Sequence, residues 1–218
     1  MTRGRLVLSA LLLAGVGGGF AGSQAIAGGS SSSGTAAPVA AQSPSLPVDP
    51  VPELLPDPTT AALSPGVRLV RQQVGAGDVR MTVPVPRGWR FSVSSLHEWQ
   101  WRPPDQPDFG YVLRVEQVLS NRRSIDWTLD RRVDELAEDG GNATILGRGA
   151  DSLHFSHVTS NHLRHVHVRW RDLTGSDNAQ VEIAVTGRQV DDPGMADLIA
   201  RVAAGVELAR PGAEAGAG

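Results

Sequence analysis

The sequence contains neither cysteine nor lysine, although it has 218 residues and 20 basic side chains, all of them arginine. Without cysteine the chain has no thiol nucleophile, no disulfide, no cysteine-linked lipid and no thiolate metal site. Without lysine it can form no Schiff base, no Ser-Lys dyad and no phosphate-loop lysine. These two absences exclude several large classes of enzyme before any motif is considered.

Recognisable catalytic motifs and a strong charge of either sign are also missing. The sequence has no Gly-x-Ser-x-Gly nucleophile elbow and no His-Glu-x-x-His metalloprotease motif. Its formal net charge is only −3, so it lacks the basic surface that nucleic acids and anionic membranes attract. We therefore expect no nucleic-acid partner and no enzymatic activity.

Residues 1–27 have the pattern of an export segment. Arg3 and Arg5 precede an apolar run from Leu6 to Val16, and small residues in an Ala-x-Ala arrangement end at Ala27. This pattern is typical of a cleavable signal peptide. The alternative is an uncleaved membrane anchor, because 22 uncharged residues from Leu6 to Ala27 would span about 33 Å as a helix. Either form places the rest of the chain outside the cell or on the outer side of the cytoplasmic membrane.

Low-complexity sequence lies on both sides of one globular domain. Residues 28–66 are rich in proline, serine and glycine, and residues 210–218 are rich in glycine and alanine. Such segments bury too little apolar surface to offset the entropy of ordering. We therefore expect a disordered, proline-stiffened linker over 28–66, a single domain over 67–209 and a disordered tail over 210–218.

Within the domain the hydrophobic period changes between that of a strand and that of a helix. Strands are expected at 69–70, 79–85, 98–102 and 111–118, and in a later meander. Ser124 and Asp192 are expected to cap two helices, the second with Pro193 at its first position. The pattern predicts an α+β fold, with an antiparallel sheet of about six strands packed against two main helices.

The registers of the meander can also be predicted. A two-residue turn at Ser160-Asn161 and a second connection through 174–178 place apolar residues across from apolar residues on the neighbouring strand. They also place charged residues across from residues of the other sign. The expected pairs are Leu153 with Val168, His154 with His167, Phe155 with Val166, Val168 with Ile183, Trp170 with Val181, Val166 with Val185, and Arg169 with Glu182.

The domain resembles the Mog1/PsbP-like superfamily, including the related domains of exported actinobacterial envelope proteins. The resemblance rests on the Pro86-Arg87-Gly88-Trp89 turn after the first strands, and on the order of the elements over residues 67–209. It implies an α/β/α sandwich that contacts other proteins, as on a photosystem or a small GTPase. The superfamily has no shared catalytic set, so the resemblance assigns no functional residue.

Histidines form the most distinctive cluster of the sequence. In the predicted register His154 lies opposite His167, and His165 lies two residues away on the same face. Three imidazoles can bind zinc or copper and leave an open coordination position. The alternative is that they are ordinary polar residues of a strand surface or half-buried ones under a helix.

Trp127 is a second candidate, for binding rather than for metal. It lies off the apolar stripe of its helix, so it either packs against the preceding loop or stands exposed as a contact residue. The other tryptophans are expected in the core. We therefore expect a non-enzymatic, exported binding or sensory module with a protein partner in the cell envelope. The alternative is a zinc- or copper-binding protein that uses His154, His165 and His167.

Overall fold

A computed structural model describes residues 53–76, 80–106, 110–118, 123–138 and 142–209. Over these residues the chain is α+β, as the sequence predicts. Its elements are β1 (Leu69–Val74), β2 (Met81–Pro86), β3 (Arg90–Ser95), β4 (Glu98–Arg102), β5 (Val112–Gln117), α2 (Ile125–Glu138), β6 (Ala143–Arg148), β7 (Ser152–Thr159), β8 (His162–Arg171), β9 (Val181–Gly187), the 3-10 turn η2 (Gln189–Asp191), α3 (Asp192–Gly205) and β10 (Glu207–Leu208).

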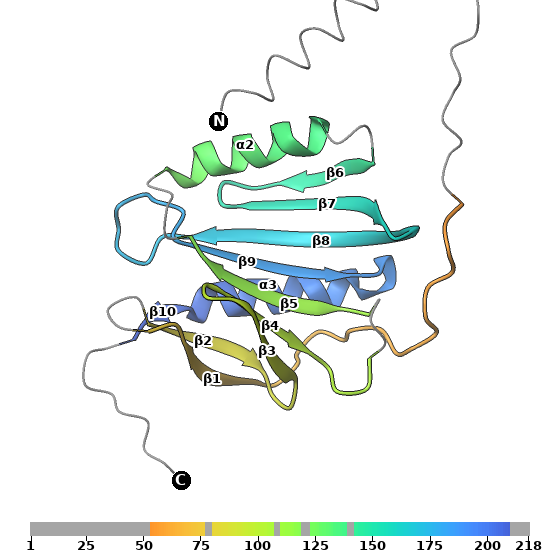
Figure 1. The fold of residues 1–218 in the computed structure, drawn as a ribbon, viewed down its shortest axis with the longest axis horizontal. Coiled ribbons are helices and arrows are strands. Elements are labelled where there is room, and N and C mark those ends of the chain that lie inside the picture. The colour runs from red at the N-terminus through yellow and green to blue at the C-terminus, as the bar shows by residue number, and fades with distance from the viewer. Residues whose placement is uncertain (1–52, 77–79, 107–109, 119–122, 139–141, 210–218) are drawn as a thin grey trace, which may run out of the picture. The chain divides into compact units, whose positions relative to one another are not determined.

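The strands form two antiparallel sheets rather than the single sheet of about six strands that was expected (Figure 1). The larger sheet has seven strands in the order β3-β4-β5-β9-β8-β7-β6, and the smaller has the order β1-β2-β10. Sequence patterning did not reveal β3, β6 or β10. All six residues of β3 are exposed, so no buried face imposes an alternating pattern on that strand.

Two apolar cores lie on opposite faces of the larger sheet. Leu129 of α2 packs with Phe155 and Trp170 on one face. On the other face α3 and the small sheet enclose a larger core that includes Trp99 and Trp101. The large sheet therefore lies between helices, as in an α/β/α sandwich, and most tryptophans fill the core as expected.

The register between β7 and β8 matches the prediction, but the register between β8 and β9 does not. Ser160 and Asn161 both have positive φ, as the two-residue turn requires, and His154 pairs with His167. In the second hairpin Val168 pairs with Ala184 and Arg169 with Ile183, one residue away from the prediction. The pairs of Val166 with Val185, Trp170 with Val181 and Arg169 with Glu182 were therefore also wrong. Because β9 is buried on both faces, its apolar pattern does not distinguish the two registers.

Residues 53–66, which we expected to belong to the disordered linker, pack against the domain. Leu63 is buried, and its amide donates a hydrogen bond to Asp191. The guanidinium of Arg188 donates to three successive parts of the segment, the carbonyl groups of Pro58, Thr60 and Ala61. A proline-rich segment can be ordered in this way because side chains of the domain satisfy its backbone groups.

The expected export segment over 1–27, the linker up to residue 52 and the tail over 210–218 lie outside the described residues. Within the described part of the chain, no helix combines the length and the apolar character needed to cross a membrane.

Candidate functional site

The three predicted histidines lie together on the face of the large sheet that α3 covers. The β7–β8 register places His154 directly opposite His167, and the side chains of His165 and His167 point to the same face because they are two residues apart on β8. The rings of His154 and His167 stack with centroids 3.9 Å apart and planes 12° from parallel. The ring of His165 lies 5.5 Å from that of His154.

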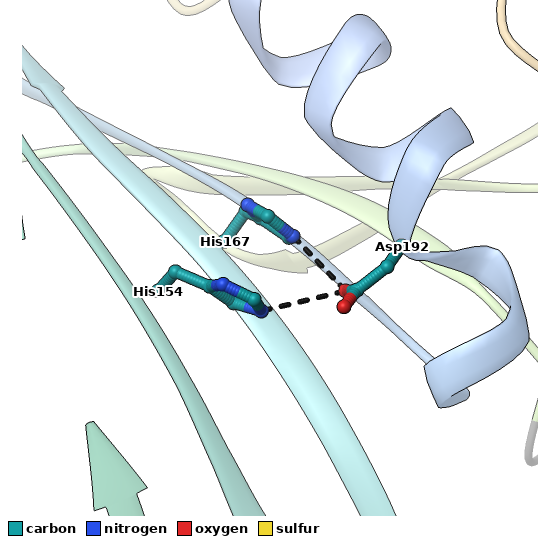
Figure 2. A group of neighbouring side chains, drawn as sticks. All are labelled: His154, His167 and Asp192. Carbon is teal, nitrogen blue, oxygen red and sulfur yellow. Dashed lines mark hydrogen bonds and ion pairs between the residues drawn. The ribbon is translucent and has the colours of Figure 1, made fainter. Parts of the chain in front are cut away.

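A carboxylate that sequence analysis did not assign to the site completes the cluster. Asp192 is the first residue of α3, and its side chain extends toward the histidines (Figure 2). Its Oδ1 lies 3.1 Å from Nε2 of His167 and 3.4 Å from Nε2 of His154, while its Oδ2 lies 2.9 Å from Nδ1 of His165. One carboxylate is thus shared by three imidazoles.

The predicted role of Asp192 as a helix cap was wrong. The N-cap residue of α3 is Asp191, and no side-chain hydrogen bond caps the helix there. Asp191 is instead occupied by Arg188 and by the amide of Leu63. The Asp-Asp-Pro sequence was a sound helix-start signal, but only the fold could reveal the contacts of Asp191 with Leu63 and of Asp192 with the histidines.

The environment of His154 favours the neutral imidazole. Burial lowers the pKa of His154, the charge of His167 lowers it further, and Asp192 opposes this without reversing it. The Nε2 atom of His154 is buried and has no hydrogen-bond partner, since its approach to Asp192 does not meet hydrogen-bond geometry. In the neutral tautomer that carries its proton on Nδ1, Nε2 has a lone pair that a metal ion can use.

The ligand atoms of His154, His167 and Asp192 have the spacing of a metal site. One atom from each residue lies within 4.8 Å of the others. Two ligands about 2.05 Å from a tetrahedral ion are separated by about 3.3 Å, and the two distances to Asp192 are 3.4 and 3.1 Å. His165 is not part of this ligand set. It holds the second oxygen of Asp192, as supporting groups around metal ligands commonly do.

Trp127 is both exposed and in contact with the preceding segment, which the sequence analysis gave as two alternatives. Its side chain is 45% exposed, and the guanidinium carbon of Arg123, from the preceding segment, lies 4.9 Å from the ring centroid. It borders a cavity of about 310 Å³ between α2 and the sheet. On the floor of that cavity the buried Glu182 accepts hydrogen bonds from Arg114, Arg132 and Trp170. Because this network is already internally paired, it has the character of a structural ion cluster.

No protein-family model matches the sequence, and no curated protein matches it either. Among solved structures, the fold is similar to that of Mog1p, a Ran-binding protein of Saccharomyces cerevisiae, with a TM-score of 0.43, 10% identity, and coverage of 64% of this chain and 96% of Mog1p. It is also similar to LpqN of Mycobacterium tuberculosis, a protein involved in cell envelope biogenesis, with a TM-score of 0.38, 14% identity, and coverage of 65% and 92%. At these values the likeness concerns the fold alone.

Proposed function

We propose that this chain is an exported binding module whose ligand is a divalent transition-metal ion, zinc or copper, held by His154, His167 and Asp192. The observation that carries the proposal is the convergence of two imidazole nitrogens on one carboxylate oxygen at 3.4 and 3.1 Å. Two imidazole nitrogens and one carboxylate oxygen suit zinc and copper better than calcium or magnesium, which prefer oxygen ligands throughout.

The protein positions these ligands before any ion arrives. His154 and His167 come from paired strands at the interior of the large sheet, and Asp192 comes from the first turn of a helix packed across β8 and β9. Rigid elements lower the entropic cost of assembling a site. His165 fixes the orientation of the carboxylate through its second oxygen.

Export and the absence of catalysis belong to the same proposal. The apolar segment at the N-terminus supports a location outside the cell or on the outer side of the cytoplasmic membrane. The sequence has no recognisable catalytic motif, which supports binding or sensing of the ion rather than turnover. The module would then deliver metal, or report its presence, to an envelope partner.

A thermal melt tests the metal site directly. The purified chain is stripped with a chelator and then melted with zinc or copper at a concentration about a thousandfold above the dissociation constant. An ion that binds only the folded state should add about 4 kcal/mol to the free energy of unfolding, which raises the melting midpoint by roughly 10 °C for a protein of this size.

The matched pair of variants is His167→Ala and His97→Ala. His167 belongs to the ligand set, whereas His97 lies in the turn between β3 and β4. His167→Ala should abolish the metal-induced rise and His97→Ala should retain it. A midpoint that neither ion moves, or an equal loss in both variants, would contradict the proposal.

A second candidate function is docking of an envelope protein, and the exposed edge strand β3 favours it. Phe91 and Val93 of β3 are 44% and 59% exposed, and Leu96 in the following turn is 86% exposed. An edge strand with exposed apolar side chains can accept a strand from a partner. A photo-crosslinker at Val93 should then capture one defined envelope protein, whereas the same group at Val190, which is 61% exposed elsewhere, should not. Equal capture from both positions would argue against docking at β3.

A further inference from the structure

A cavity adjoins the candidate metal site on the α3 face of the large sheet. Its volume is about 360 Å³. Its floor is formed by β6, β7 and β8, and one wall is formed by α3. His154 and His167 belong both to its lining and to the metal ligand set. An ion held by these two imidazoles would therefore lie at the border of the cavity.

The charged side chain that enters the cavity is basic. Arg169 lies on the same face of the sheet as the two imidazoles and contributes a guanidinium group, and Ser152 opposite it contributes a hydroxyl. Arg148 also borders the cavity, but it pairs with Leu153 across the strands, and its guanidinium reaches Asp130 of α2 on the opposite face. Among the described residues, no carboxylate side chain lines the cavity.

Arg169 is paired outside the cavity, but its capacity to donate is not exhausted. It donates to Asp151 through Nε. A guanidinium group has five N–H donors, so Arg169 retains its terminal nitrogens for an anionic ligand.

Small side chains keep the remainder of the cavity open. Gly147 and Gly149 line the β6 side, and Ala196 and Ala200 line the helix side together with the apolar Ile199. Since a water molecule occupies about 30 Å³ in the liquid, the cavity has room for a ligand of roughly a dozen non-hydrogen atoms. Its mixed lining suits a molecule with one anionic end and a compact apolar body.

The charge of the metal site sets the charge of this ligand. A divalent ion bound by two neutral imidazoles and one carboxylate retains one positive charge, and three protein ligands leave a tetrahedral ion one open position. A monoanion would fill that position and neutralise the charge. A carboxylate meets this requirement, and arginine pairs with carboxylates through two parallel hydrogen bonds.

We propose that the cavity binds a small organic carboxylate, whose anionic group lies beside Arg169 and whose oxygen completes the coordination of the metal. This inference rests on the proposed metal site for the coordination step, whereas Arg169 and the cavity are independent of it. The protein would thus bind a metal–carboxylate pair rather than a bare ion.

The test uses the full chain loaded with cobalt(II), whose visible absorption bands report its ligands, and titrates it with benzoate and with inorganic phosphate. Benzoate should shift the bands with saturation. Arg169→Gln should weaken the benzoate response roughly tenfold, as expected for the loss of one charged hydrogen-bonding group. Arg131→Gln is the matched control, because Arg131 lies on α2, outside this cavity, in an exposed pair with Glu135.

A second variant removes space without removing charge. This variant is Ala200→Leu. Ala200 is an exposed residue of α3 that lines the cavity, and leucine is a good helix former. The variant should leave the cobalt spectrum unchanged and reduce benzoate binding at least tenfold. A response to benzoate that is equal in the wild-type protein and both cavity variants would overturn the inference.

The outcomes separate this inference from the metal proposal. If cobalt binds and benzoate has no effect, or if only phosphate binds, the carboxylate inference fails and the metal site stands. If cobalt does not bind, the melts with zinc and copper decide the metal proposal, and calorimetry of benzoate with the metal-free protein decides the cavity alone. Saturable binding that Arg169→Gln weakens would support the carboxylate site, and no binding would overturn it.

Discussion

Two neighbouring aspartates at the start of α3 have opposite surroundings. Asp191 is completely buried, and Arg188 pairs with both of its oxygens at 2.8 Å. Burial alone would raise the pKa of Asp191, but hydrogen bonds from Arg188 and from the Leu63 amide outweigh it and hold the pKa below its ordinary value. Asp192, one residue later, is partly exposed and meets three imidazoles.

With the proposed metal site, one sequence motif would serve stability and binding at once. Arginine carries a permanent charge. If another cation took the place of Arg188 at Asp191, the buried guanidinium of Arg188 would be left unpaired. Imidazoles are neutral over much of the physiological range and exchange protons and metals readily. We interpret Asp191 as the lock that holds residues 53–66 on the domain, and Asp192 as the carboxylate available to a ligand.

The largest expected effect comes from Asp191→Asn. This change leaves the buried Arg188 without a counter-charge, so the free energy of unfolding should fall by about 3–5 kcal/mol. Urea unfolding would measure the loss, and hydrogen exchange should show faster exchange at Leu63. The control is Glu135→Gln, which removes an exposed ion pair with Arg131 and should cost less than about 1 kcal/mol. Similar losses in both variants would show that Asp191 is not a lock.

Gly194→Ala should disturb the same lock through shape rather than charge. A Cβ atom at this position would lie 2.0 Å from the carbonyl oxygen of Leu63, so the segment would have to move. We expect a loss of roughly 1–3 kcal/mol, whereas the same change in an open helix would stabilise by up to about 1 kcal/mol. A thermal melt decides the sign, and a gain in stability would show that residues 53–66 do not press on α3.

Asp192→Asn should separate binding from stability. The substitution keeps the size of the side chain, and its surroundings are partly exposed, so the metal-free protein should lose no more than about 1 kcal/mol. The stabilisation by zinc should fall by more than half, because one of three ligands has lost its charge. Paired melts with chelator and with zinc measure both quantities. A large loss without metal and an unchanged response to zinc would reverse the roles assigned to the two aspartates.

The smallest effect concerns the second attachment of residues 53–66. The Gly66 amide and then Arg201 lower the pKa of Asp197 below its ordinary value of 3.8. The unfolded state therefore binds more protons than the folded state between these two values, so the contribution of Asp197 is complete above pH 3.8 and is lost as the pH falls through the folded value. Asp197→Asn should destabilise by about 0.5 kcal/mol at pH 7, and this difference should vanish in acid. A difference that does not depend on pH would exclude the carboxylate as its cause.

Local patterns in the sequence were sufficient for the parts of the fold that depend on local chemistry. The Ser160-Asn161 turn tolerates positive φ, which determined the β7–β8 register and with it the pairing of His154 with His167. The apolar stripe of α3 is buried as its spacing predicts. The clustering of histidines on one face therefore followed from the sequence alone.

Contacts between distant segments were beyond the sequence. Asp191 meets Arg188 locally, three residues away in the η2 turn, but its contact with Leu63 is long-range. Only the path of α3 back across β8 brings Asp192 to the histidines. The order of residues 53–66 has the same origin, since their backbone groups are satisfied by side chains more than a hundred residues away. The sequence by itself determined which side chains could bind a metal. Tertiary structure decided which of them meet, because a carboxylate acquires its role from the cation or imidazole that packing places beside it.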